Sequence, residues 1–237
     1  PPKSIRDLEQ RCRIRDLEQV RGRRLEAFLE VVQRCCGAEP VTSKGTENEL
    51  LLRLLSKHRT LITGSRIRCC PFSDEECAQV EQYVNRGGNL LLMSNHDPYA
   101  KRDSRLPERF GVSLAGGYGG GGPAWIAIDG DDLGTHCITN NLSGGIVFNT
   151  SCRIHCTNPN ASVLATLPGE AGQANGFAVA IDGPARSSSG RIVVLADSGF
   201  IGNDDTKFPG PGLIGQGTNR QFIKNCVYWL HAEEVLP

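Results

Sequence analysis

The sequence lacks an excess of positive charge, a long apolar run and any C-x-x-C pair. Its 26 lysines and arginines balance 26 aspartates and glutamates, which disfavours a nucleic-acid-binding protein because such proteins are usually basic. No apolar run approaches the roughly 18 residues that cross a membrane. Structural zinc sites usually pair two C-x-x-C motifs, and none is present. We therefore predict no nucleic-acid partner, no membrane span, no metal and no cofactor.

The cysteines that are present are numerous. Ten cysteines in 237 residues favour disulfides in an oxidising compartment. Cys152 and Cys156 flank His155 and give only a weak metal signal. Three glycosylation-type triplets point to the same compartment. They begin at Asn141, Asn149 and Asn160. Together these features predict a secreted or periplasmic glycoprotein.

The first 34 residues differ from the rest. They are charged and helix-prone, and Ile5–Gln10 recurs as Ile14–Gln19 at an offset of nine residues. Nine residues do not match a helical period, so the two copies would not share one face. We predict a helical arm over residues 1–34 that is either solvated or used to contact a second copy or a partner. The main domain then spans residues 35–237.

One helix–strand unit organises the main domain. Ser73 is a good helix N-cap, apolar residues recur at helical spacing after it, and Gly87-Gly88 favours the end of the helix. Leu90–Met93 then forms an uninterrupted apolar run, typical of a parallel strand buried on both faces. The polar segment 94–98 follows at once. Functional sites of open parallel sheets collect at such carboxyl ends.

The remaining pattern is that of an α/β protein with a β-rich second half. Thr60–Thr63 and Arg191–Ala196 are predicted as buried strands, and Gln221–His231 as the last helix. Short β-like runs separated by turn residues predict a β-rich portion over about 123–182. The glycine-rich residues 116–122 precede a strand rather than a helix, so we expect a flexible surface loop there and not a phosphate cradle.

Several segments in this order resemble a known family. The resemblance covers roughly residues 45–232 and rests on Pro71–Glu76, Tyr83–Leu92, Asn95-His96-Asp97-Pro98, Arg109–Val112, Thr135–Thr139, Gly190–Ser198, Thr218–Phe222 and Trp229-Leu230. These segments resemble uncharacterised amidotransferase-like proteins, which share the class I glutamine amidotransferase-like fold but generally lack its cysteine nucleophile. The resemblance implies a flavodoxin-like, mostly parallel sheet with flanking helices, into which the β-rich portion is inserted.

The predicted catalytic candidates are His96, Asp97 and Asp197. His96 would lie at the carboxyl end of a strand beside Asp97, and near Asp197 if the two apolar strands are parallel neighbours. An imidazole held by a carboxylate can act as a general base. The family motif resembles Asp-His-x-Pro, so Asn95 stands where the family has an acid, and Asp97 is the available substitute. The alternative is that His96 only bonds its own loop and Asp197 only caps a turn.

The predicted ligand-binding candidates are Ser94, Asn95, Asn219 and Arg220. Ser94 lacks the flanking glycines of a nucleophile elbow and is better explained as a cap of the strand tip. Asn219 and Arg220 begin the last helix, where an anion could bind, although Asn219 also fits an N-cap. No cysteine stands at the strand tip, so glutaminase activity is rejected.

The function predicted from these features is that of a non-catalytic binding or interaction module. Its partner would be a carbohydrate or a protein, including a second copy bound through residues 1–34. One alternative is a hydrolase that uses His96, Asp97 and Asp197. Another is a structural subunit of an extracellular assembly. The enzyme alternative predicts convergence of His96 and Asp197, whereas the binding hypothesis predicts exposed aromatics such as Tyr99, Tyr118 or Trp125.

Overall fold

The computed structural model describes residues 59–64, 71–119, 125–169, 175–183, 189–202 and 213–231. The predicted arm over residues 1–34, and any contact that it makes, lies outside these residues. No helix among the described residues is long and apolar enough to cross a membrane.

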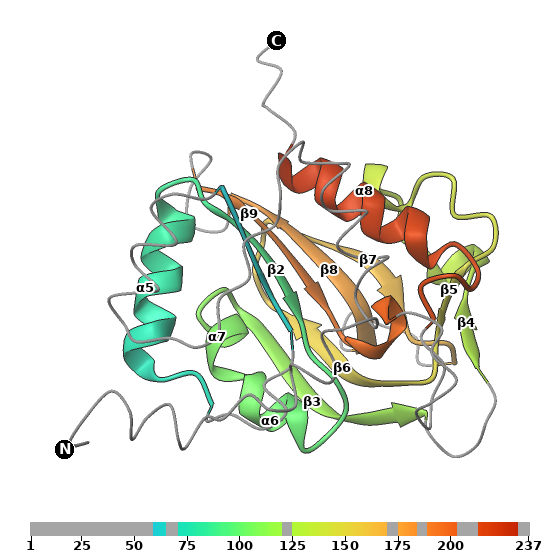
Figure 1. Ribbon diagram of the computed structural model, residues 1–237, viewed down its shortest axis with the longest axis horizontal. Helices are drawn as coiled ribbons and strands as arrows, with labels where there is room; N and C mark the ends of the chain where they lie inside the picture. Colours follow the sequence, from blue (N-terminus) through green and yellow to red (C-terminus); the bar gives the residue numbers. More distant parts are fainter. Residues whose placement is uncertain are drawn as a thin grey trace, which may run out of the picture.

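The main sheet is mixed. Its order is β1-β2-β9-β8-β6-β3, and β7 pairs with β8 as the seventh strand (Figure 1). The first three are parallel and the others antiparallel. The bounds are β1 Thr60–Thr63, β2 Asn89–Met93, β3 Val112–Gly119, β6 Thr150–Cys156, β7 Ala161–Thr166, β8 Gly176–Asp182 and β9 Arg191–Leu195. A separate antiparallel pair joins β4 Ile126–Ile128 to β5 Ile146–Phe148.

Two helices flank the parallel strands. Figure 1 shows α5 on one side of β2 and β9, and α8 on the other. The helices are α5 Asp74–Asn85, α6 Tyr99–Asp103, α7 Arg105–Glu108 and α8 Asn219–His231, with 3-10 turns η1 Gly130–Asp132, η2 Cys137–Thr139 and η4 Gly199–Ile201. The predicted N-cap of α5 is confirmed, because Ser73 Oγ accepts from the Glu76 N–H at 3.1 Å and Glu76 Oε2 accepts from the Ser73 N–H at 2.7 Å.

The predicted pairing of the two apolar strands is also confirmed. β2 and β9 lie side by side and parallel, with Leu90 opposite Ile192 and Met93 opposite Leu195. The glycines before these strands allow the close approach of their amino ends. A Cβ on Gly190 would lie 1.9 Å from the carbonyl oxygen of Gly88, and Gly87 adopts φ +96°. Both polar strand tips therefore lie at the same edge of the sheet.

The α/β class is confirmed, but the mostly parallel, flavodoxin-like arrangement is not, because the described sheet is mixed. The β-rich portion contributes β6, β7 and β8 to this same sheet. The expectation of a loop over the glycine-rich residues was wrong at Gly116, Gly117 and Gly119, which belong to β3. Pairing with β6 overrides local flexibility there, and the register shifts between Ala115 and Tyr118, as in a β-bulge.

Aromatic rings join the layers of the core. Phe177 of β8 contacts Phe148 of β5 at 4.7 Å between ring centroids and Phe200 of η4 at 5.7 Å. Phe200 in turn lies 6.2 Å from Phe222 of α8. All four side chains are fully buried. This row fixes the start of α8 and the turn after β9 against the sheet, and so positions the strand tips.

The described cysteines are free thiols. They are Cys77, Cys137, Cys152, Cys156 and Cys226. The predicted disulfides are therefore not seen in the part of the chain that is described, and the other five cysteines lie outside it. Cys152, His155 and Cys156 all belong to β6. Among the described residues, no group of three or more histidine, cysteine, aspartate or glutamate side chains is placed to hold a metal ion.

Candidate functional site

The carboxyl ends of β2 and β9 bring the predicted polar residues together. The Ser94 N–H donates to the Leu195 carbonyl at 2.9 Å, and Asn95 Nδ2 donates to Ser198 Oγ at 3.3 Å. Ser94 and Asp197 are buried, whereas Asn95, His96 and Asp97 are half-buried. The cluster predicted from the two strand ends therefore forms, with a closed inner part and a more open outer part.

The closed part contains two residues that sequence reasoning did not select. Ser94 Oγ donates to Asp103 Oδ2 at 2.9 Å, and Asp103 is only 2% exposed at the end of α6. The second is Cys152, whose thiol hydrogen bonds with Ser94 and with the Ala196 carbonyl, the latter at 3.4 Å. Asp103 comes from a charged, exposed-looking segment. Cys152 carried only the weak metal signal shared with His155 and Cys156, and nothing local in the sequence linked it to the strand tips.

Cys152 is not arranged as a nucleophile. It lies inside β6 rather than at a strand-to-helix elbow, and its side chain is fully buried. Burial raises the pKa of the thiol to about 12, and the hydrogen bond with Ser94 opposes this only in part. The thiolate, which is the reactive form, is therefore scarce near neutral pH. Cys77 is likewise fully buried within α5, and burial raises its pKa.

Asp197 is used by the turn that follows β9. Its Oδ1 accepts from the Gly199 N–H at 2.6 Å, and the backbone amides of Ser198 and Phe200 also bond the carboxyl. The side chain is 3% exposed. Burial raises its pKa to about 7, although the three backbone bonds act in the opposite direction. Asp197 therefore holds η4 in place while titrating near neutral pH.

His96 is held by a backbone carbonyl. Its Nδ1 lies 2.6 Å from the Asp97 carbonyl oxygen, and its ring meets Tyr99 edge-on at 5.5 Å. A carbonyl oxygen can only accept, so Nδ1 carries the proton and Nε2 of the neutral ring presents a lone pair. Within the described residues, the imidazole makes no hydrogen bond to the carboxylate of Asp97 or Asp197. Asp97 Oδ2 pairs instead with Lys101 Nζ at 3.4 Å.

Asn219 is fully occupied by backbone groups. Its Oδ1 accepts from the Val147 N–H at 2.8 Å, and its Nδ2 donates to the carbonyls of Val147 and Leu213, each at 2.7 Å. The residue is completely buried. Its amide thus mimics a strand residue pairing with β5 and joins the start of α8 to that strand. Arg220 lies on the exposed side of the same helical turn.

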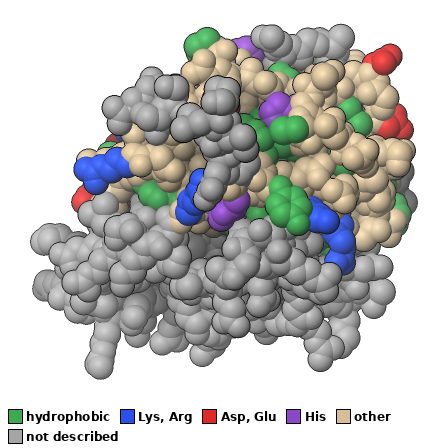
Figure 2. All heavy atoms as spheres, turned by 90° about the horizontal axis from the view of Figure 1, so that it is seen from above, with side chains coloured by type: hydrophobic (Ala, Val, Ile, Leu, Met, Phe, Trp, Pro, Cys, Tyr) green, Lys and Arg blue, Asp and Glu red, His purple; other side chains and the backbone are tan. Residues whose placement is uncertain are grey.

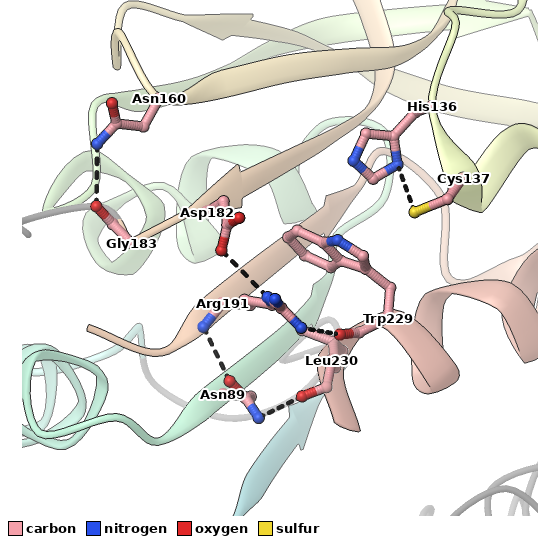
Figure 3. A network of polar contacts seen from close by, with 9 residues as sticks. All are labelled: Asn89, His136, Cys137, Asn160, Asp182, Gly183, Arg191, Trp229 and Leu230. Carbon is pink, nitrogen blue, oxygen red and sulfur yellow. Dashed lines mark hydrogen bonds and ion pairs between the residues drawn. The ribbon is translucent and has the colours of Figure 1, made fainter. Parts of the chain in front are cut away.

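A second polar network lies at the opposite, amino end of the parallel strands (Figure 3). Asn89 Oδ1 accepts a hydrogen bond from the Arg191 N–H, and Asn89 Nδ2 donates one to the Leu230 carbonyl. Arg191 Nε lies 3.1 Å from Asp182 Oδ1, Nη1 donates to the Trp229 carbonyl at 2.8 Å, and the guanidinium lies 5.2 Å from the Trp229 ring centroid. These contacts join the ends of β8 and α8 to the starts of β2 and β9.

His136 extends this network. Its ring meets Trp229 edge-on at 5.4 Å, and its Nδ1 accepts from the Ile138 N–H at 3.1 Å. This hydrogen bond makes His136 the cap of η2. Figure 2, which views the molecule from above, shows histidine and basic side chains beside hydrophobic ones on the upper face of the molecule.

Comparisons with known proteins support the fold. No family profile matches the sequence, and no curated protein matches it. The mmIFT52 N-terminal domain is similar in structure, with TM-score 0.68 and 14% identity over 90% of this chain and 92% of that chain. The Cytoplasmic Protein STM3548 from Salmonella typhimurium is similar with a TM-score of 0.52 and 11% sequence identity, and the match covers 87% of each chain. The Cytoplasmic Protein STM1381 from Salmonella typhimurium LT2 is similar with a TM-score of 0.51 and 12% sequence identity, and the match covers 85% of this chain and 86% of that chain.

Proposed function

We propose that this chain is a non-catalytic binding module with an amidotransferase-like fold. The observation that carries the proposal is the internal use of the polar groups at the strand tips. Ser94 is bonded to Asp103, Asp197 to the turn after β9, and Asn219 to β5. Of the two catalytic carboxylate candidates, Asp197 is bonded to the turn after β9, while Asp97 pairs with Lys101 through Oδ2 and its buried Oδ1 has no hydrogen-bond partner among the described residues. Neither carboxylate is hydrogen-bonded to the imidazole of His96.

Exposed aromatic rings support a binding surface. Trp125 and Tyr228 are the large hydrophobic side chains that stand exposed among the described residues, at 45% and 47%. Such rings supply much of the binding energy at interfaces. Of the other two aromatics considered from the sequence, the Tyr118 hydroxyl donates to the Pro168 carbonyl, and Tyr99 packs against His96.

The same fold also occurs as one domain of a larger protein in mmIFT52.

The hydrolase alternative has one observation in its favour. The Nε2 lone pair of His96 lies at the carboxyl end of β2, on a half-buried residue, and a lone pair in that position could accept a proton. The assembly alternative depends on residues 1–34 and would be tested by deleting them and measuring the oligomeric state.

The first two functions separate in one experiment. Wild type, His96→Ala and Trp125→Ala are assayed for hydrolysis of p-nitrophenyl acetate, p-nitrophenyl phosphate and p-nitrophenyl β-galactoside. The same three proteins are tested for binding to an oligosaccharide array. The same proteins are examined for self-association by sedimentation. The binding-module hypothesis predicts that all three proteins turn over the substrates only at the background rate. It also predicts that sugar binding or self-association is lost only in Trp125→Ala. Saturable turnover that His96→Ala abolishes would establish the hydrolase instead.

We also propose that the protein is secreted and glycosylated. Asn141 and Asn160 are exposed, as a glycosylation acceptor requires, although Asn160 Nδ2 donates to the Gly183 carbonyl at 2.9 Å. Intact mass before and after glycosidase treatment of protein purified from its natural source tests this directly.

A further inference from the structure

His136 occupies a position in which protonation breaks its own hydrogen bond. Its Nδ1 accepts from the Ile138 N–H at 3.1 Å, while its backbone N–H donates to Thr139 Oγ1 at 3.1 Å. A backbone N–H can only donate, so Nδ1 carries the lone pair and Nε2 the proton. A second proton on the ring must bind Nδ1, where it would face the Ile138 N–H.

The turn that His136 caps is docked on α8. Ile138 is fully buried, and Asn225 Nδ2 of α8 donates to the Ile138 carbonyl at 2.8 Å and to the Asn140 carbonyl at 3.1 Å. The Trp229 ring of the same helix meets the imidazole edge-on (Figure 3). Loss of the cap therefore weakens a tertiary contact and not only a local turn.

The charges facing the imidazole do not offset its burial. Burial is the largest influence and lowers the pKa of His136, Asp182 of β8 raises it, and Arg191 of β9 lowers it. Asp182 is itself paired with Arg191. From α8 the ring meets the aromatic Trp229, and within η2 the Cys137 thiol lies 3.7 Å from Nδ1. The folded arrangement thus favours the neutral ring.

We propose that His136 is a pH-sensitive latch: the neutral imidazole holds η2 on α8, and protonation releases Cys137–Thr139 from the helix. The latch is independent of the binding function proposed above. It requires only that the cap accept a hydrogen bond at Nδ1 and that this nitrogen be the site of protonation.

Amide hydrogen exchange at Ile138 tests the latch. Protection of this amide, corrected for the intrinsic exchange rate, is compared at pH 7.5 and 5.5. In wild type it should fall about five-fold, the effect expected from losing one cap. His136→Asn is the matched variant, because an asparagine cap accepts the same bond without titrating. Its protection should stay constant, and His155→Asn, at an exposed site on β6, should respond as wild type.

Constant protection in wild type, or an equal fall in His136→Asn, would overturn the proposal. A second measurement needs no variant. The Ile138 amide shift and the His136 ring shift are followed by NMR across the same pH range in wild type. The latch requires one shared midpoint, and two separate midpoints would also overturn it.

Discussion

The two ends of the parallel strands carry polar clusters of opposite character. At the carboxyl end, Ser94, Asp103 and Asp197 are buried and bonded to one another or to backbone. At the amino end, Asn89 is also buried, but Arg191 pairs with Asp182, whose side chain is 64% exposed to solvent. The comparison shows that a polar strand tip is not by itself an active site. The end predicted to be functional has a closed interior, and the other end holds a histidine whose cap hydrogen bond cannot survive protonation.

Their histidines show the same contrast. His96 donates through Nδ1 to a carbonyl, and this bond survives protonation because Nδ1 already carries its proton. His136 accepts through Nδ1, and its bond does not survive. Residue type and approximate exposure are alike at the two sites. The partner of one nitrogen decides the response to acid.

The largest expected effect is at the buried carboxyl end. Asp197→Ala leaves the backbone amides after β9 without their acceptor and should lower the free energy of unfolding by about 3 kcal/mol. Asp197→Asn keeps one acceptor oxygen and should cost about 1 kcal/mol at pH 5. Denaturant unfolding measures both. Equal costs for the two variants would show that the hydrogen bonds are not what Asp197 contributes.

The pH dependence of Asp197→Asn sharpens this result. The pKa of Asp197 is raised to about 7 in the folded protein, from about 4 when unfolded. The folded state therefore binds more protons than the unfolded state between these values, and wild type loses stability as the pH rises through 7. The cost of Asp197→Asn relative to wild type should accordingly shrink between pH 5 and 8. A cost that grows instead would contradict the direction of the shift.

A smaller effect separates the ion pairs of the two ends. Arg191→Ala removes two hydrogen bonds and the contact with the Trp229 ring from a side chain only 17% exposed, and should cost about 2 kcal/mol. Lys101→Ala removes a pair whose lysine is 79% exposed, and should cost less than about 0.5 kcal/mol. Both are measured by denaturant unfolding in low and high salt. Equal losses of unfolding free energy in Arg191→Ala and Lys101→Ala would show that the two ion pairs do not differ in their contribution to stability.

The smallest effect concerns the histidines. The pKa of His136 is lowered by folding, so the stability that its neutral form contributes is complete above the usual histidine pKa of about 6.5 and is lost as the pH falls below it. His136→Asn should therefore abolish the acid-dependent loss of the His136 contribution, which amounts to about 0.5 to 1 kcal/mol between pH 7.5 and 5.5 and is read from the difference between variant and wild type at the two pH values. His96→Asn should leave that loss unchanged. A larger change in the pH dependence of stability in His96→Asn than in His136→Asn would contradict the contrast drawn between the two histidines.

Local chemistry predicted the elements well where their pattern was strong. The Ser73 cap, the apolar run after Gly88 and the helical spacing of α8 each depend on neighbouring residues, and all three were confirmed. The glycine-rich strand β3 and the strand β6 were missed or misassigned, because pairing with distant strands, and not a local pattern, stabilises them. Asp103 was missed as a site residue for the same reason, since its partner Ser94 lies on another element.

The sequence by itself therefore determined an α/β chain whose two apolar strands end in polar tips, because periodicity and caps are local. Only the tertiary structure decided what those tips do. The pKa of an acid, the reactivity of a thiol and the tautomer of a histidine depend on burial and on which atom faces which donor or acceptor. Residues distant in sequence supply those surroundings, so Asp197 became a turn anchor, Cys152 an inert thiol and His136 a candidate latch.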